Sequence, residues 1–189
     1  ANKIWNASRF VMMNLSIDHY ELPAADKLER EDKWVLSKLN RLVKEVTENL
    51  DSFEIGVASA KVYDFIWDTY CDWYIELTKT RLNGTDEDAK LTAQNVLCYV
   101  LVTLLKLLHP FMPFITEEIY QALPKCGGAE DILMTAQWPE YTEALSFPAE
   151  ESAMEAVMDL IRAIRARRAE MNVPPSKKAE LMIVTDQAE

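Results

Sequence analysis

The residues best spaced to do chemistry in this chain are carboxylates set four positions apart. Asp68, Asp72 and Glu76 repeat in this way, and two carboxylates on one helix face can act as a general acid and a general base. The same spacing is more typical of a solvated helix surface. The chain has only 4 glycines, and it contains no glycine-rich phosphate loop, no G-x-S-x-G elbow and no H-E-x-x-H motif. We therefore predict no catalytic site in this chain.

Cysteine and histidine offer little more. Cys71, Cys98 and Cys126 form no C-x-x-C pair, which is typical of reduced thiols in a cytoplasmic protein. Cys71 and Cys98 fall in apolar segments, where we expect them to be small core residues. His19 and His109 are the only two histidines, so we predict neither a metal site nor a Cys–His catalytic pair.

Aromatic rings beside cations are the other groups with chemical potential. Arg9 and Phe10 lie near the N-terminus, and Lys33 and Trp34 are adjacent further along. Unstacked RNA bases need rings for stacking and guanidinium groups for hydrogen bonds at their edges. Core packing would explain Trp34 equally well, and both interpretations stay open at this point.

Charge is uneven along the chain, although its net value of −11 argues against nucleic acid as a partner. Residues 1–48 are neutral, residues 49–160 carry a net −13, residues 161–178 a net +5 and residues 179–189 a net −3. Arg165 and Arg168 belong to the basic stretch. They are either surface residues paired with acidic neighbours or contacts for phosphate, which suits arginine geometry.

Helical periodicity dominates the elements that must position these residues. Segments with apolar side chains at three- and four-residue spacing predict helices at 2–15, 29–50, 53–82, 86–109, 113–123 and 149–171. A long loop is expected at 124–149 and a short strand at 181–184. No apolar run approaches the roughly 18 residues of a membrane span. The sequence therefore predicts an all-α antiparallel bundle with a small C-terminal appended element.

Particular residues should shape the ends of these helices. Thr85 and Asp88 resemble a capping box, and Gly84 should end the preceding helix in the left-handed conformation. In the segment LHPFMPFITEEIY, Pro110 should end one helix and Pro113 should start the next. We expect Phe111, Phe114 and Ile115 to fill the corner between these two helices.

Four segments in this order resemble one known family. NKIWNASRF (2–10), YDFIWDTYCDWYIE (63–76), LHPFMPFITEEIY (108–120) and MNVPPSKK (171–178) are similar to the anticodon-binding helical domain of class I aminoacyl-tRNA synthetases. The resemblance is closest to the valine-specific members, because of the fourth segment and the arginine-rich helix before it. The isoleucine-specific members are the alternative, and a non-catalytic helical module that binds a basic protein is a second one.

The resemblance implies a division of labour. We expect an anticodon-binding bundle at 1–145 and, at 146–189, a helix followed by the start of a truncated α/β extension. The partner would be the anticodon loop of tRNA(Val), and the catalytic domain of the same polypeptide would use ATP and Mg²⁺. The parent would be a cytoplasmic monomer, with no membrane partner. The residues expected to touch RNA are Arg9, Phe10, Lys33, Trp34, Lys38, Arg165 and Arg168.

Overall fold

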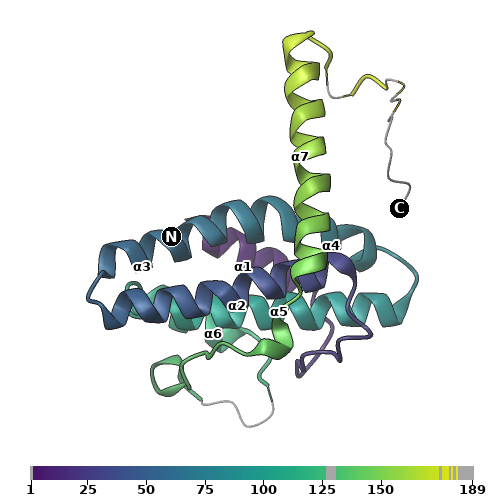
Figure 1. The fold of residues 1–189 in the computed structure, drawn as a ribbon. Coiled ribbons are helices and arrows are strands. Elements are labelled where there is room, and N and C mark those ends of the chain that lie inside the picture. The colour runs from purple at the N-terminus through teal and green to yellow at the C-terminus, as the bar shows by residue number, and fades with distance from the viewer. Residues whose placement is uncertain (1, 127–130, 175, 179, 181, 183–189) are drawn as a thin grey trace. The chain divides into compact units, whose positions relative to one another are not determined.

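The regular elements of the described residues are all helical (Figure 1). The computed structural model describes residues 2–126, 131–174, 176–178, 180 and 182. The chain divides into two compact units, Ala1–Ser152 and Ala153–Glu189. The expected all-α class is confirmed, whereas the strand expected at 181–184 falls largely outside the described residues. The helices are α1 (Asn2–Asn14), α2 (Arg30–Asp51), α3 (Ile55–Asp64), η1 (Phe65–Tyr74), α4 (Ile75–Leu82), α5 (Glu87–Leu108), α6 (Pro113–Ala122) and α7 (Pro148–Glu170), with short 3₁₀ turns at Leu133–Thr135 and Glu143–Leu145.

Helix α5 is the central element of the first unit. Almost every residue from Thr92 to Leu108 is buried, and α5 packs against α1, α2, α3, α4 and α6. By length and composition alone α5 could cross a membrane, but 78% of its most apolar window is buried inside the fold. Burial of this kind is what a core helix shows, because its apolar surface is already removed from water.

The segments α3, η1 and α4 form one continuous helix from Ile55 to Leu82, which lies alongside α2 (Figure 1). Its middle third is π-helical, and the backbone N–H of Ile75 bonds to the carbonyl of Tyr70, five residues back. Most π-helices are single turns and many occur at functional sites. On this segment Tyr70 and Tyr74 face the core, and the Tyr70 hydroxyl donates to the carbonyl of Leu97 on α5 at 3.0 Å.

Two details of the helix ends differ from expectation. The N-cap of α5 is Asp86, whose carboxylate accepts from the backbone N–H groups of Asp88 and Ala89, so the Thr85 capping box is wrong. Gly84 does not have a positive φ. A Cβ at Gly84 would lie 3.1 Å from the Thr80 carbonyl oxygen, so close approach is the reason for glycine there.

At the turn between α5 and α6, α5 ends at Leu108, two residues before Pro110, although His109 still has helical dihedrals (φ −55°, ψ −42°). Pro113 is the first residue of α6. Phe111 and Ile115 are half-buried. Phe114 is 90% exposed, so its expected place in the corner is wrong.

The end of α2 contains the one aromatic residue with positive φ in the described part of the chain. Phe53 has φ 59° and is 88% exposed. Its backbone N–H bonds to the Leu50 carbonyl, and the N–H of Glu54 bonds to the Asn49 carbonyl. This is a Schellman motif, in which glycine or asparagine usually takes the left-handed position.

Replacing Phe53 by asparagine is expected to raise the free energy of unfolding by about 1 kcal/mol, because asparagine adopts the left-handed conformation at lower cost. Chemical denaturation of the 189-residue chain measures the change. Phe53→Ala is the control: it removes the exposed ring and keeps the strain, so its stability should match that of the parent chain. If the Phe53→Asn chain were no more stable than the Phe53→Ala chain, the proposal that the left-handed backbone at residue 53 is strained would be contradicted.

Candidate nucleic-acid interface

Helix α1 presents two of the expected contact residues on its outer face. Its inner stripe of Ile4, Ser8 and Val11 is buried, and the Ser8 hydroxyl donates to the carbonyl of Ile4 at 2.7 Å. Arg9 is exposed and Phe10 is half-buried. The helical spacing that buries the stripe therefore leaves a guanidinium group and part of an aromatic ring at consecutive positions on the outer side of the helix.

Lys79 of α4 lies beside Phe10. Its Nζ is 5.5 Å from the centroid of the Phe10 ring, within cation–π range, and 2.6 Å from Oε1 of Glu76. Of the other spaced carboxylates, Asp72 pairs with Lys3 at 2.8 Å and Asp68 is exposed. These three carboxylates form a solvated helix face, and no pair of them is buried as an acid–base pair would be.

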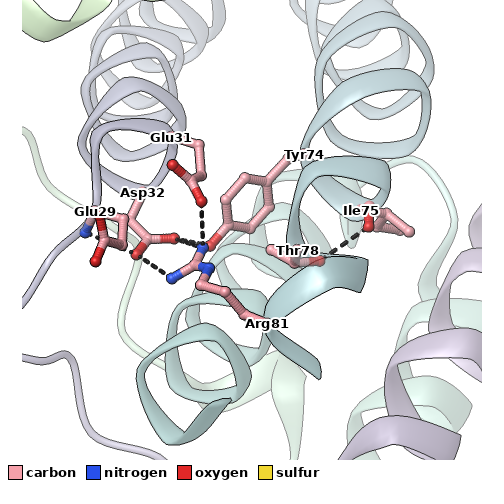
Figure 2. Close-up of polar contacts among 7 residues, drawn as sticks. All are labelled: Glu29, Glu31, Asp32, Tyr74, Ile75, Thr78 and Arg81. Atoms are coloured by element: carbon pink, nitrogen blue, oxygen red, sulfur yellow. Dashed lines mark hydrogen bonds and ion pairs between the residues drawn. The ribbon is translucent and has the colours of Figure 1, made fainter. Parts of the chain in front are cut away.

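The first turn of α2 is held against α4 by a buried ion pair (Figure 2). Asp32 has no exposed surface, and its carboxylate accepts two hydrogen bonds from Arg81, at 2.6 and 2.8 Å. It also accepts from the Tyr74 hydroxyl at 2.6 Å and from the backbone N–H of Glu29 at 3.1 Å. Glu31 adds a second carboxylate 3.2 Å from Arg81.

Electrostatics agree with this geometry. Burial alone would lower the pKa of the Arg81 guanidinium, but hydrogen bonds and charge from Asp32 raise it above its ordinary value. Burial, and then the charge of Asp32, raises the pKa of the Tyr74 hydroxyl, so Tyr74 stays a neutral donor. A charged pair with these bonds fixes the angle between α2 and α4. Helix α4 thus contacts both expected RNA-binding segments, through Lys79 at Phe10 and through Arg81 beside Lys33.

Two of the residues expected to touch RNA on α2 are occupied by packing. Trp34 has no exposed surface, so no base can stack on it in this structure, and we assign it to the core. Lys38 is half-buried, with its Nζ 5.6 Å from the centroid of the Trp34 ring.

The third, Lys33, lies under an acidic strap, which we define as residues 137–151. Lys33 is 3.5 Å from Glu150, and Arg41 pairs with Glu151. The strap is tied to α2 by the Asn40 side chain, which bonds to both the N–H and the carbonyl of Thr142, at 2.9 and 2.7 Å. Phosphate would have to displace Glu150 to reach Lys33.

The second unit holds Arg165 and Arg168. Arg165 is exposed on α7. Arg168 donates to the carbonyls of Pro174 and Lys177 at 2.8 and 2.6 Å. It therefore ties the segment after α7 back to the last turn of the helix. Asn172, with φ 54°, ends α7 in a second Schellman motif.

The structure thus brings together Phe10 and Lys79 in the first unit, with Arg9 exposed at the position before Phe10. Lys79 was missed because its neighbour in space is 69 positions away in the sequence. Its only local signal is a cation in the last turn of a helix, and the helix dipole explains that position without any ligand.

Comparison with known proteins identifies a family for most of the chain. The family model described as the anticodon-binding domain of tRNA ligase matches residues 32–183. The match covers most of the first unit and extends along α7.

Individual relatives are more specific. The chain is 53% identical to a valine–tRNA ligase of Clostridium acetobutylicum over 189 residues, which are 98% of this chain and 21% of the relative. It is 48% identical to one of Carboxydothermus hydrogenoformans over 185 residues, 98% of this chain and 21% of the relative. It is 46% identical to one of Bacillus cereus over 183 residues, which are 96% of this chain and 20% of the relative. The chain thus spans about a fifth of the length of these relatives.

Proposed function

Because the chain belongs to the family of anticodon-binding domains of tRNA ligases, we propose that it holds the anticodon arm of valine tRNA for a valine–tRNA ligase. The observation that carries this proposal is the identity of 46–53% to valine–tRNA ligases over nearly the whole chain. The same identity favours the valine enzymes over the isoleucine enzymes. It also favours a tRNA ligase over an independent protein-interaction module.

The chemical steps would take place elsewhere in the enzyme. Joining valine to the 3′ end of tRNA would use ATP and Mg²⁺ in a catalytic domain, and the class I motifs His-x-Gly-His and Lys-Met-Ser-Lys-Ser do not occur in this sequence. Among the described residues no three His, Cys, Asp or Glu side chains gather as metal ligands do, so we derive no metal chemistry from them. The enzyme would act in the cytoplasm.

The contribution of this chain would be binding energy far from the reacting atoms. In our proposal the Phe10 ring stacks on an unpaired base of the anticodon loop, Arg9 hydrogen-bonds to a base edge or phosphate, and Lys79 contacts the backbone. The ion pair of Lys79 with Glu76 is exposed and is worth only about 0–1 kcal/mol, so an RNA phosphate can replace it. Arg165, Lys33 and Lys38 remain proposed as secondary contacts.

The proposal is tested by titrating the 189-residue chain with a valine tRNA transcript and with the same transcript carrying another anticodon. We expect binding that weakens with salt and is tighter for the valine anticodon, because phosphate contacts release counterions and base contacts specify sequence. Lys79→Ala should reduce the slope of log K against log salt by about 1.

Lys90→Ala is the matched control, since Lys90 forms the same exposed i,i+3 pair, with Glu87 at 3.9 Å, on another helix. Its slope should equal that of the parent chain. A parent chain that ignores both salt and anticodon would refute the function. If the slope were unchanged for Lys79→Ala while the parent chain bound normally, only the proposed contact of Lys79 with the RNA backbone would be refuted.

A further inference from the structure

Two large aromatic side chains stack on each other at the surface, away from the Arg9–Phe10 site. Tyr63 and Trp67 have ring centroids 5.6 Å apart and planes 21° apart, yet they are 57% and 40% exposed. They line a pocket of about 420 Å³ whose apolar lining includes Ile4, Leu108 and Met112. The pocket therefore gathers apolar side chains from α1, the α3–η1 helix, the end of α5 and the turn after it.

A lysine of the same chain is bound at this aromatic surface. The Nζ of Lys3 lies 3.5 Å from the centroid of the Trp67 ring, and it is 2.8 Å from Oδ1 of Asp72. An ammonium group is thus held between an aromatic face and a carboxylate, a combination that favours cations. Trp67 and Asp72 both belong to the π-helical segment η1.

The charge around the aromatic pair is negative and therefore also favours cations. Asp64 and Asp68 follow Tyr63 and Trp67 directly in the sequence and are exposed. Within the described residues neither one forms an ion pair, in contrast to Asp72. These carboxylates would repel an RNA backbone and attract lysine or arginine.

We infer that this pocket docks a protein surface that presents an apolar side chain flanked by lysine or arginine, and that this surface belongs to the rest of the same polypeptide. The inference rests on the proposed function, because the valine–tRNA ligases that the chain resembles have about four-fifths of their length outside the matched stretch. A domain within a long chain buries part of its surface against its neighbours. Exposed apolar patches with polar rims mark such interfaces.

The experiment is photo-crosslinking in the full-length polypeptide that carries the chain, with Tyr63→p-benzoylphenylalanine as the probe. Leu91→p-benzoylphenylalanine is the control, because Leu91 is similarly exposed, at 48%, on α5. We expect the probe at Tyr63 to give an intramolecular crosslink to a peptide outside residues 1–189 that contains lysine or arginine. The probe at Leu91 should give none.

Two further substitutions test the chemistry of the pocket. Trp67→Glu should abolish the crosslink, and Trp67→Phe, which keeps a ring, should retain it. Asp68→Lys changes only an exposed residue and reverses the charge of the rim, so it should reduce the crosslink without affecting the fold measured by circular dichroism. A crosslink that is unchanged by Asp68→Lys would overturn the charge argument.

Other outcomes overturn the docking itself. They are a crosslink to added tRNA, a crosslink to a second copy of the polypeptide, or a yield no greater than at Leu91. Each can be told apart from a failure of the proposed function, because the tRNA titration of the 189-residue chain does not involve this pocket.

Discussion

The Arg81→Met chain is expected to lose about 3–5 kcal/mol of its free energy of unfolding. Removing the guanidinium group leaves the Asp32 carboxylate buried, with no exposed surface and no counter-charge, and an uncompensated buried charge costs about that much. The melting temperature should fall by roughly 6 to 20 °C for a domain of this size. Thermal and chemical denaturation of the 189-residue chain measure both quantities.

Two variants sharpen this result. Lys90→Met breaks an exposed pair and should change stability by less than about 1 kcal/mol. The double variant Asp32→Leu with Arg81→Met removes both charges and should recover part of the loss, since apolar replacements of a buried pair are often tolerated. A loss below about 1 kcal/mol in Arg81→Met would mean that water or another cation compensates Asp32.

The second large effect is expected on binding. Phe10→Ala should weaken binding of valine tRNA by about 1–3 kcal/mol, or roughly 5- to 150-fold in Kd, because stacking of one base on an aromatic ring is worth that much. The slope of log K against log salt should stay the same, because no phosphate contact is lost. Arg9→Ala should instead reduce the slope or the preference for the valine anticodon. Equilibrium titrations at several salt concentrations measure all three quantities.

Phe53→Ala is the control for Phe10, since it removes an even more exposed ring just after the C-terminal end of α2, whereas Phe10 lies on α1. It should bind tRNA as the parent chain does, and Phe10→Tyr should retain most of the affinity. Equal affinities for Phe10→Ala and Phe53→Ala would show that the anticodon arm binds elsewhere on the chain.

Much of the fold could be predicted from the sequence because the helices are long and their apolar stripes are regular. The expected segment 29–50 is α2 at Arg30–Asp51, and 86–109 is α5 at Glu87–Leu108. Exposure within an aromatic segment could not be predicted. Tyr70 and Tyr74 are buried, whereas Tyr63 and Trp67 on the same helix are exposed. A π-helical segment changes which positions share a face, and periodicity arguments assume an α-helix.

The candidate site was less predictable than the fold for a related reason. The α1 residues Arg9 and Phe10 could be proposed from residue type and family resemblance. Trp34 has the same chemistry and is in the core, because its position on α2 faces inward. Lys79 and Arg81 acquire their neighbours through packing between helices that are distant in the sequence. The cost of a buried charge makes the Arg81–Asp32 pair important, and burial cannot be read from the residue types alone.

The π-helical segment η1 also determines how far α4 is rotated about the helix axis relative to α3. A helix advances about 100° per residue, so deleting one residue between Phe65 and Tyr74 would rotate α4 by about that angle relative to α3. Arg81 would then turn away from Asp32, and Lys79 away from Phe10. The length of this segment therefore sets the direction in which both side chains point. A single-residue deletion there should be far more harmful than a substitution of the exposed Asp68.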